Sequence, residues 1–312
     1  MKLSGAQIIV KILEQYGIKT VAGLPGGMIL PLYNELNKSS IQHVLVRQEQ
    51  AAGFIAQGMT RSSGKPAICM ATSGPGAMNL LTAIADARAD SIPIIAITGQ
   101  VNTSQIGTDA FQEADTFGLS FPITKHSIMV KNAQELLSAI PQAFEIALSG
   151  RPGPILIDVP KNVQIEQIEI DDNYFDSSRT FSSDKEVKFH SSKQEISESV
   201  LEIINLLKTA KKPVLFCGGG CNTEDGSKSI QKFLSAYKIP VVTSLMGLGS
   251  VPSTDECFIG MLGMHGSYAA NVAIHDCDLV IAAGVRFDDR ATGAVSEFCP
   301  NAKLIHIDID AA

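Results

Sequence analysis

The sequence predicts an α/β protein made of two open parallel-sheet domains. Short strands that are apolar along their whole length alternate with amphipathic helices, a pattern typical of a parallel sheet covered by helices on both faces. Glycine turns follow several of these strands. The 312 residues, of which 45% are hydrophobic and 18% charged, fit two domains with a large buried interior and not a disordered chain.

The first domain is expected at residues 1–165. Its opening helix, AQIIVKILEQYG, carries apolar residues at helical spacing and stops at Gly17. Further helices are expected from the periodic runs MILPLYNELNKS, EQAAGFIAQGMTRSSG, GPGAMNLLTAIADARAD and NAQELLSAIPQAFEIALSG. Strands are expected at KTVAGL, IQHVLV, PAICMATS, IPIIAITG and PILIDVP.

A linker and a second domain are expected after this. Residues 166–192 are polar, acidic and serine-rich without a sustained period, as in an interdomain linker. Within residues 193–312 we expect helices at ISESVLEIINLLKTA and GSKSIQKFLSAYK, and strands at PVLFCGGG, PVVTSL, DLVIAAG and KLIHIDID. The chain stops directly after the last strand, so we expect this domain to be incomplete and the chain to be truncated at its C-terminus.

Charge and hydropathy exclude several classes of partner. The net charge of −7 and the absence of a basic cluster argue against nucleic acid. No run approaches the about 18 apolar residues that span a bilayer, and the N-terminus lacks the pattern of a signal peptide. We therefore expect a cytoplasmic protein without membrane contact. The six cysteines are scattered in apolar runs, which favours buried, reduced thiols over a metal site.

Three glycine turns, GLPGG, TSGPGAMN and ITGQ, each follow a predicted strand of the first domain. Ligands of open parallel sheets bind at the carboxyl ends of strands, near the point where the topology switches direction. Glycine at such turns lets the backbone approach a ligand closely. The alternative is that these are ordinary strand-to-helix turns.

Glu49 lies on the same predicted edge, between the strand IQHVLV and the helix that follows it. A buried carboxylate is costly unless it is paired. Because residues i and i+2 of a strand share a face, an ion pair with Arg47 is one interpretation. The other is that Glu49 meets a ligand, and its surroundings alone leave both open.

Three further segments have compositions that suit ligands. The irregular stretch 105–127 is unusually long for a compact domain, and its Phe111 and Gln112 suit a small polar substrate, although a plain surface loop is the alternative. In the second domain, Arg286 and Arg290 lie near glycine turns, where they suit phosphates, or else form a solvated ion-pair network with Asp288 and Asp289. In the final HIDID, metal ligation competes with contact to a ribose or a neighbouring turn.

Taken together, these segments resemble a known family. GLPGG, VLVRQEQAAGFIAQGMTR, TSGPGAMNLLT, DSIPIIAITGQV, DAFQEAD, SGRPGPILIDVPK, SLMGLG, GMLGMHG, GVRFDDR and HIDID occur in the order seen in the large catalytic subunit of acetolactate synthase (acetohydroxyacid synthase). The resemblance runs from residue 3 to about 310. It implies a thiamine-diphosphate transferase of branched-chain amino acid biosynthesis, which condenses two pyruvates, or pyruvate and 2-ketobutyrate, with loss of CO₂ to 2-acetolactate or 2-aceto-2-hydroxybutyrate.

The resemblance also implies three cofactors and the residues that bind them. The first domain would bind the aminopyrimidine ring of thiamine diphosphate, with Glu49 as the catalytic carboxylate on its ring nitrogen. The middle domain would bind FAD, and a third domain, absent here, would hold the diphosphate through Mg²⁺, so no metal ligand is expected in this chain. Thiamine contacts are implied for Gly26, Gly27, Pro75 and Asn79. Flavin contacts are implied for Arg151, Gly218, Gly219, Gly220, Leu245, Met246, Gly263, Met264, His265, Gly284, Arg286, Arg290, Asp308 and Ile309.

Substrate contacts are implied for Phe111, Gln112, Lys161 and Arg286, with Gln112 and Lys161 also taking part in catalysis. The implied partners are further catalytic subunits, in a homodimer or homotetramer, and a small regulatory subunit. Since the family's active sites join the first domain of one subunit to the third of another, we expect residues 1–312 alone to be inactive. The alternatives are another thiamine-diphosphate carboligase or decarboxylase, a pyruvate oxidase, and a non-catalytic fragment that binds cofactor or dimerises.

Overall fold

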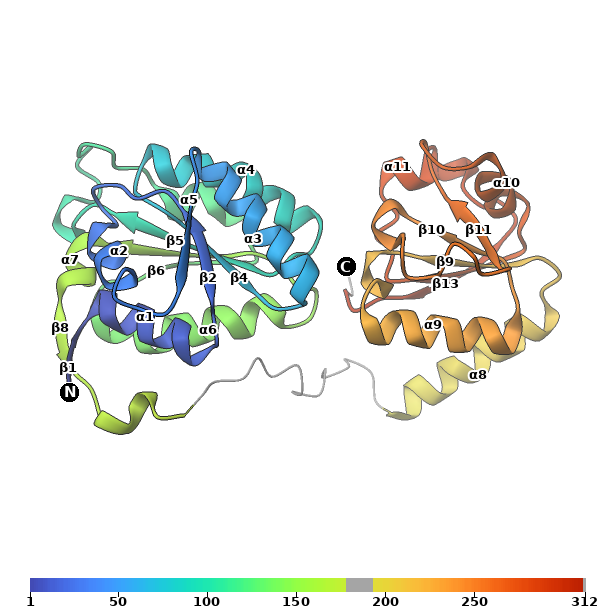
Figure 1. Cartoon of the computed structure of the whole chain (residues 1–312). Coiled ribbons are helices and arrows are strands. Elements are labelled where there is room, and N and C mark those ends of the chain that lie inside the picture. Colours follow the sequence, from blue (N-terminus) through green and yellow to red (C-terminus); the bar gives the residue numbers. More distant parts are fainter. Residues whose placement is uncertain (178–192, 311–312) are drawn as a thin grey trace. The chain divides into compact units, whose positions relative to one another are not determined.

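The computed structural model describes residues 1–177 and 193–310. The chain forms two compact units, Met1–Val187 and Lys188–Ala312, each of which has its own sheet (Figure 1). Both sheets are parallel and lie between helices, which confirms the predicted α/β class. The part of the expected linker at residues 178–192 lies outside the described residues.

The first unit is built on a six-stranded sheet in the order β3-β2-β4-β5-β7-β6, with every pairing parallel. The strands are β2 (Thr20–Gly23), β3 (Gln42–Leu45), β4 (Ala67–Ala71), β5 (Ile94–Gln100), β6 (His126–Met129) and β7 (Ile155–Pro160). The chain leaves β2 toward β3 on one side and returns to β4 on the other. The turns after β2 and β4 therefore diverge, which makes this the switch point of the sheet.

Helices cover both faces of this sheet (Figure 1). They are α1 (Gly5–Gln15), α2 (Leu30–Leu36), α3 (Glu49–Ser63), α4 (Pro75–Ala89), α5 (Thr116–Ser120), α6 (Leu136–Leu148) and α7 (Lys161–Ile165). On β4, Ile68 and Met70 pack with α1, α2 and α6, whereas Cys69 and Ala71 pack with α3 and α4. Alternate residues of a strand point to opposite faces, which explains why the central strands are apolar throughout.

Two segments of the first unit differ from the expectation. The stretch expected to be irregular through residue 127 contains α5 and begins β6, an edge strand whose HSIM sequence is too short and polar to give a strand signal. Part of the expected linker is structured: β8 (Gln167–Glu169) pairs antiparallel with β1 (Lys2–Ser4). The Tyr174 hydroxyl then donates to the Leu137 carbonyl at 2.9 Å. Residues 167–175 thus pack on the first unit, while the domain limits themselves stay a prediction.

The second unit has a five-stranded parallel sheet in the order β11-β10-β9-β12-β13. Its strands are β9 (Pro213–Cys217), β10 (Val241–Thr243), β11 (Phe258–Met261), β12 (Leu279–Ala283) and β13 (Lys303–Ile307). Its helices are α8 (Lys193–Thr209), α9 (Glu224–Tyr237), α10 (Tyr268–Asp276) and α11 (Asp289–Thr292). Residues of α10 pack on one face and those of α8 and α9 on the other. The glycine-interrupted β11 and the short α10 were not anticipated.

No helix among the described residues combines the length and apolar character needed to cross a bilayer. The six cysteines are free thiols, five of them buried and Cys257 half-buried.

The close packing of α3 on α4 depends on Gly53. A Cβ at Gly53 would lie 2.5 Å from the Ala83 Cβ, whereas a Cβ at Gly58 on the same helix has no atom within 4 Å. We expect Gly53→Val to lower the free energy of unfolding by about 1–3 kcal/mol, since overpacked side chains force neighbours apart. Gly58→Val is the matched control and should change it by less than about 0.5 kcal/mol. Urea unfolding measures both, and equal losses would contradict the packing argument.

Candidate functional site

The candidate site of the first unit lies at the carboxyl ends of β2, β3 and β4, beside the switch point. Glu49 is the first residue of α3 and only 8% of it is exposed. The N-terminal dipole of a helix stabilises a carboxylate there by about 0.3–1 kcal/mol. That is less than a buried charge costs, so further hydrogen bonds are needed.

Asn79 supplies such a bond from the neighbouring helix. Its Nδ2 donates to Glu49 Oε2 at 2.8 Å. Arg47 is exposed, and in the described part of the chain no ion pair joins it to Glu49. The ion-pair interpretation is therefore wrong: β3 ends at Leu45 and α3 begins at Glu49, so the two residues do not share a strand face.

The other oxygen of Glu49 has no hydrogen-bond partner among the described residues. Glu49 Oε1 lies 3.3 Å from the point where a Cβ on Gly76 would stand. Burial raises the pKa of Tyr33 on α2, and the Cys69 thiol and the Glu49 carboxylate raise it further. The phenol thus stays neutral near Glu49. The site therefore presents one unpaired carboxylate oxygen beside a glycine.

Thr72, directly after β4, joins the two diverging turns. Its hydroxyl accepts a hydrogen bond from the Met28 backbone N–H at 3.2 Å. A Cβ on Gly26 would lie 2.5 Å from the Thr72 methyl, and one on Gly76 would lie 2.8 Å from it. Both glycines are therefore needed for this contact, whereas a Cβ on Gly27 would meet nothing within 4 Å. Thr72 was not predicted, because a lone threonine beside a glycine run carries no signal.

The glycine turn after β4 also contacts the predicted substrate loop. Gly74 has φ +56°, and a Cβ there would lie 2.4 Å from the Gln112 carbonyl oxygen. Gln112 is half-buried with φ +57°, a strained value for a residue other than glycine. Phe111 is 81% exposed. The structure thus brings the backbone of Gln112 onto the same turn as Pro75, which begins α4.

Lys161 stands at the same edge of the sheet, as the first residue of α7 after β7, and is half-buried. The fully buried Gln164 on α7 donates from Nε2 to the Met28 carbonyl at 2.8 Å and to the Val159 carbonyl at 2.9 Å. The element that presents Lys161 therefore also holds the turn that contains Gly26 and Gly27.

These residues fit the aminopyrimidine of thiamine diphosphate. A ring N–H or protonated ring nitrogen needs an acceptor in a site that is largely removed from water, and Glu49 Oε1 is such an acceptor. Among the nearby glycines, Gly27 leaves open space beside its backbone, since a Cβ there would meet nothing within 4 Å. Buried carboxylates with one unsatisfied oxygen are functional-site candidates on chemical grounds.

The flavin residues predicted in the second unit lie at the carboxyl ends of its strands, and several contact one another. A Cβ at Gly218 would lie 2.0 Å from the Gly284 carbonyl oxygen, and one at Gly219 would lie 3.0 Å from the Met246 Cβ. The Met264 N–H donates to the Arg290 carbonyl at 2.9 Å. The glycines of these turns therefore let neighbouring turns pack closely on one another. This packing is a use of the glycines besides the flavin contact that their sequence positions suggested.

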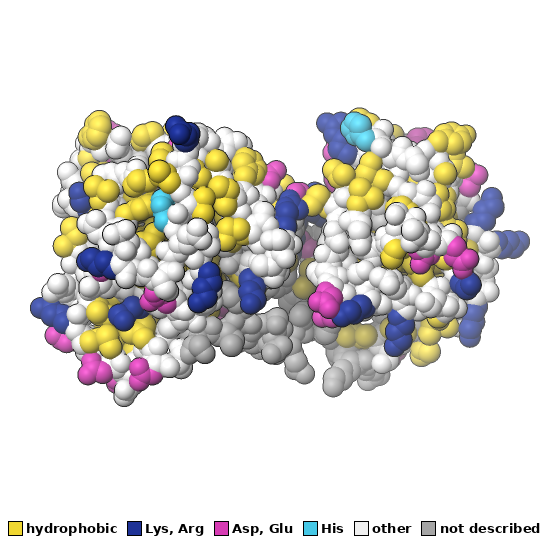
Figure 2. Space-filling model, viewed as in Figure 1, with side chains coloured by type: hydrophobic (Ala, Val, Ile, Leu, Met, Phe, Trp, Pro, Cys, Tyr) yellow, Lys and Arg dark blue, Asp and Glu magenta, His cyan; other side chains and the backbone are white. Residues whose placement is uncertain are grey.

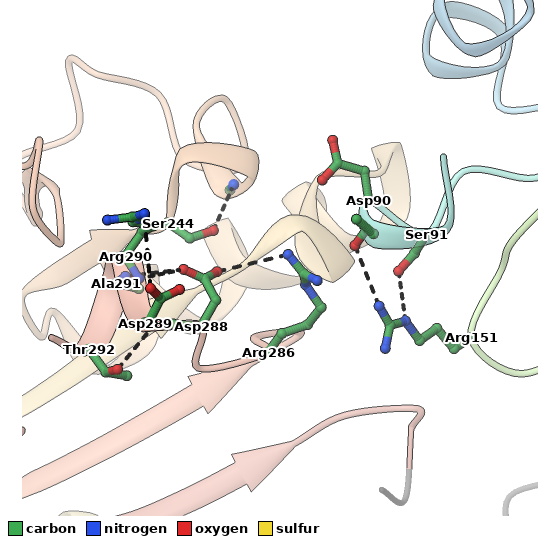
Figure 3. A network of polar contacts seen from close by, with 12 residues as sticks. Asp90, Ser91, Arg151, Ser244, Arg286, Asp288, Asp289, Arg290, Ala291 and Thr292 are labelled. Carbon is green, nitrogen blue, oxygen red and sulfur yellow. Dashed lines mark hydrogen bonds and ion pairs between the residues drawn. The ribbon is translucent and has the colours of Figure 1, made fainter. Parts of the chain in front are cut away.

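The two arginines of this edge form exposed ion pairs. Arg286 lies 3.9 Å from Asp288, and Arg290 Nε lies 3.8 Å from Asp289 (Figure 3). Asp288 also caps α11 by accepting the backbone N–H groups of Arg290 and Ala291 at 3.1 and 3.2 Å. The solvated ion-pair network anticipated as an alternative is thus present. At the same edge, Leu245 and Met264 are exposed by 67% and 65%.

The final predicted strand and Arg151 complete the set. His306 Nε2 lies 2.9 Å from the Val285 carbonyl and 3.6 Å from Asp308, so the end of β13 contacts the neighbouring turn. The described residues contain no group of three His, Cys, Asp or Glu side chains that could hold a metal ion. Arg151 belongs to the first unit, where its Nε donates to the Ser91 hydroxyl at 2.8 Å (Figure 3).

The Asn79–Glu49 bond can be tested by exchanging its partners. Asn79→Asp places two carboxylates together, which raises their pKa values in the folded state. We expect a loss of about 1–3 kcal/mol in the free energy of unfolding at pH 7. The loss should shrink as the pH falls toward 4, since the folded protein then binds a proton that the unfolded chain binds only at lower pH.

The double variant Asn79→Asp/Glu49→Gln restores one donor and one acceptor and should recover most of the stability at pH 7. Urea unfolding across pH 4–8 measures all three proteins. A double variant as unstable as Asn79→Asp would mean that the two side chains do not interact as described.

Comparisons with known proteins identify the two domains of the chain. Residues 3–119 match the family described as thiamine pyrophosphate enzyme, N-terminal TPP binding domain, and residues 200–312 match the thiamine pyrophosphate enzyme central domain. The acetolactate synthase isozyme 1 large subunit of Escherichia coli K12 is 50% identical over 312 residues, which cover 100% of this chain and 53% of that protein. A probable acetolactate synthase large subunit of Methanocaldococcus jannaschii is 45% identical, covering 99% of this chain and 52% of its own length.

The isozyme 2 large subunit of Escherichia coli K12 is also 45% identical, with 99% of this chain and 54% of that protein covered. The chain thus spans about half the length of the curated relatives it matches. With both domain matches in sequence order and 45–50% identity along the whole chain, the chain belongs to the thiamine pyrophosphate enzyme family.

Proposed function

We propose that this chain acts as the large, catalytic subunit of an acetolactate synthase. It would condense two pyruvates, or pyruvate and 2-ketobutyrate, with loss of CO₂ to 2-acetolactate or 2-aceto-2-hydroxybutyrate, in valine, leucine and isoleucine biosynthesis. The observation that carries the proposal is the buried Glu49 at the switch point of the sheet, with one oxygen held by Asn79 and the other without a hydrogen-bond partner in the described part of the chain. The names and identities of the relatives supply the reaction.

Glu49 is the proposed catalytic carboxylate. Its unpaired oxygen would hold the proton at the pyrimidine ring nitrogen of thiamine diphosphate, while the bond from Asn79 fixes the carboxylate's orientation. Gly27, where a Cβ would meet nothing within 4 Å, would leave the ring room to approach the backbone, and Gly26 and Pro75 would contact the cofactor beside it. The cofactor, when bound, supplies the electron sink that decarboxylation of a 2-ketoacid requires.

The substrate side of the proposal involves Phe111, Gln112 and Lys161. The Lys161 ammonium suits the carboxylate of a 2-ketoacid, and the Gln112 amide suits its keto oxygen. Phe111, which is mostly exposed, offers an apolar surface for the substrate's alkyl group. Arg286 is proposed to meet the second ketoacid as well as the flavin.

FAD is proposed at the interlocked turns of the second unit. These turns present backbone groups, two arginines and the exposed side chains of Leu245 and Met264. FAD would be structural there, because the condensation involves no net redox change. Mg²⁺ is proposed to bind with the diphosphate, through ligands other than the residues described.

The proposed assembly is a homodimer or homotetramer with a small regulatory subunit, in the cytoplasm. The name "large subunit" of the relatives supports a second kind of subunit. Hydrophobic side chains are exposed on the viewed face of the first unit (Figure 2). The exposed ones on and beside α3, α4 and α5 include Leu45, Phe54, Met78, Phe117, Leu119 and Phe121. Apolar surface of this kind supports association with another subunit.

Glu49→Gln tests the proposal in the natively assembled protein, supplied with thiamine diphosphate, Mg²⁺ and FAD. Removing a proton-transfer partner should lower acetolactate formation from pyruvate by ~10²–10⁴-fold and slow exchange of the thiazolium C2 proton, followed by NMR. Glu35→Gln is a matched control, since Glu35, on α2, forms an ion pair with Lys38 just after the helix, and it should keep the parent rate.

Wild-type rates in Glu49→Gln would remove the role assigned to this carboxylate. Turnover under anaerobic conditions without an electron acceptor separates the synthase from a pyruvate oxidase, because an oxidase stops when its flavin cannot be reoxidised.

A further inference from the structure

A second buried carboxylate lies in the first unit, away from Glu49. Asp158, in β7, is fully buried. Its Oδ1 accepts the Thr98 hydroxyl at 2.7 Å and its Oδ2 accepts Gln100 Nε2 at 2.9 Å, both from the adjacent β5. No ion pair reaches Asp158 among the described residues. The reaction proposed above does not use it, so its cost calls for another explanation.

Gln100 extends this network to the substrate loop. Its Nε2 also donates to the Ala114 carbonyl at 2.9 Å, and its Oε1 accepts the Val101 backbone N–H at 2.9 Å. Both amide hydrogens and the amide oxygen are therefore used. A flipped amide would set its oxygen against the Ala114 carbonyl and the Asp158 carboxylate, and its NH₂ against the Val101 N–H. Asp158 thus fixes the one orientation in which Gln100 holds Ala114.

The loop that ends at Ala114 is braced internally. The Glu113 carboxylate accepts the backbone N–H groups of Gly107 and of Ala110, the latter at 2.9 Å. The Gln112 backbone rests on Gly74. These hydrogen bonds connect the residues of the loop to one another. The hydrogen bond from Gln100 on β5 to the Ala114 carbonyl therefore also sets the position of Phe111 and Gln112.

We propose that Asp158 and Gln100 are positioning residues that fix the loop at 105–115 in place beside the edge of the sheet where Glu49 lies. The loop's substrate role rests on the proposed function, whereas the hydrogen bond between Gln100 and Ala114 does not. Neither residue touches substrate: each acts through the Ala114 carbonyl.

The protonation of Asp158 accompanies this role. Burial raises the pKa of Asp158 to about 7, against the hydrogen bonds from Thr98 and Gln100, and the charge of Asp115 raises it further. When neutral, Asp158 can donate from Oδ1 to the Thr98 hydroxyl while Oδ2 still accepts from Gln100, so the hydrogen bond between Gln100 and Ala114 survives protonation. The other ionisable groups on elements packed against β7 are the exposed His126 and Glu145 and the half-buried Lys161.

The first test measures how strongly the Gln100–Ala114 hydrogen bond holds the loop, without any assay of activity. Gln100→Leu removes the bond to Ala114 at nearly constant volume. In the natively assembled protein, hydrogen exchange of the amides at 107–113 should become at least ~10-fold faster, because local opening no longer breaks this bond. Gln57→Leu is the matched control, since Gln57 is 3% exposed and its Nε2 donates to the Ala83 carbonyl at 2.9 Å. It should leave these amides unchanged.

The second test separates substrate from cofactor. Asp158→Leu should raise the KM for pyruvate by ~10-fold and leave thiamine-diphosphate affinity within about twofold, since Glu49 is untouched. Asp158→Asn can accept from Gln100 and donate to Thr98, so it should restore the parent KM. Asp158→Asn should also remove the fall in the free energy of unfolding that Asp158 causes as the pH rises from 4 to 7. In that range the folded protein keeps a proton that the unfolded chain loses.

Unchanged exchange at 107–113 in Gln100→Leu, or an equal increase in Gln57→Leu, would overturn the inference. So would cofactor affinity falling together with pyruvate affinity in Asp158→Leu. A parent protein that makes no acetolactate would refute the proposed function only, because the exchange result stands apart from it.

Discussion

The hydrogen bond between Asn79 and Glu49 depends on how closely two helices approach. Gly53 brings α3 against Ala83 of α4, and Gly76 then lies beside Glu49 Oε1. Only at that separation does the Asn79 amide reach the carboxylate across the helix pair. The bond to a charged acceptor is worth about 1.5–3 kcal/mol and offsets part of the desolvation of Glu49. Small residues along α3 are thus a requirement of the site as much as of the core.

Glycine has different uses in the two units. In the first, the turns at Gly26, Gly74 and Gly76 admit Thr72 and the Gln112 carbonyl, while Gly27 stays open. In the second, Gly218 and Gly220 are filled by the backbone of Gly284. A strand-end glycine can therefore expose backbone to a ligand or pack one turn on the next, and sequence position alone does not distinguish these uses.

The sequence predicted most of the central strands because burial on both faces makes them apolar throughout. It placed Glu49 at the correct edge but left an ion pair with Arg47 open, since deciding required the strand to end before Glu49. The edge strand β6 was missed because it is short and partly polar. Thr72 and the Asp158–Gln100 network were missed for another reason: their partners come from distant segments, and single polar residues in a strand carry no periodic signal.

The two buried carboxylates of the first unit show why one is available to a ligand and the other is not. Within residues 1–177 and 193–310, neither is paired with a cation, and each is held by neutral donors. Asp158 is fully buried and both its oxygens accept hydrogen bonds, so no lone oxygen is left for a new partner. Glu49 keeps 8% exposure and has a single described donor. A group that brings a hydrogen-bond donor to the free oxygen of Glu49 relieves a cost already present in the fold, and this favours ligand binding at Glu49 over Asp158.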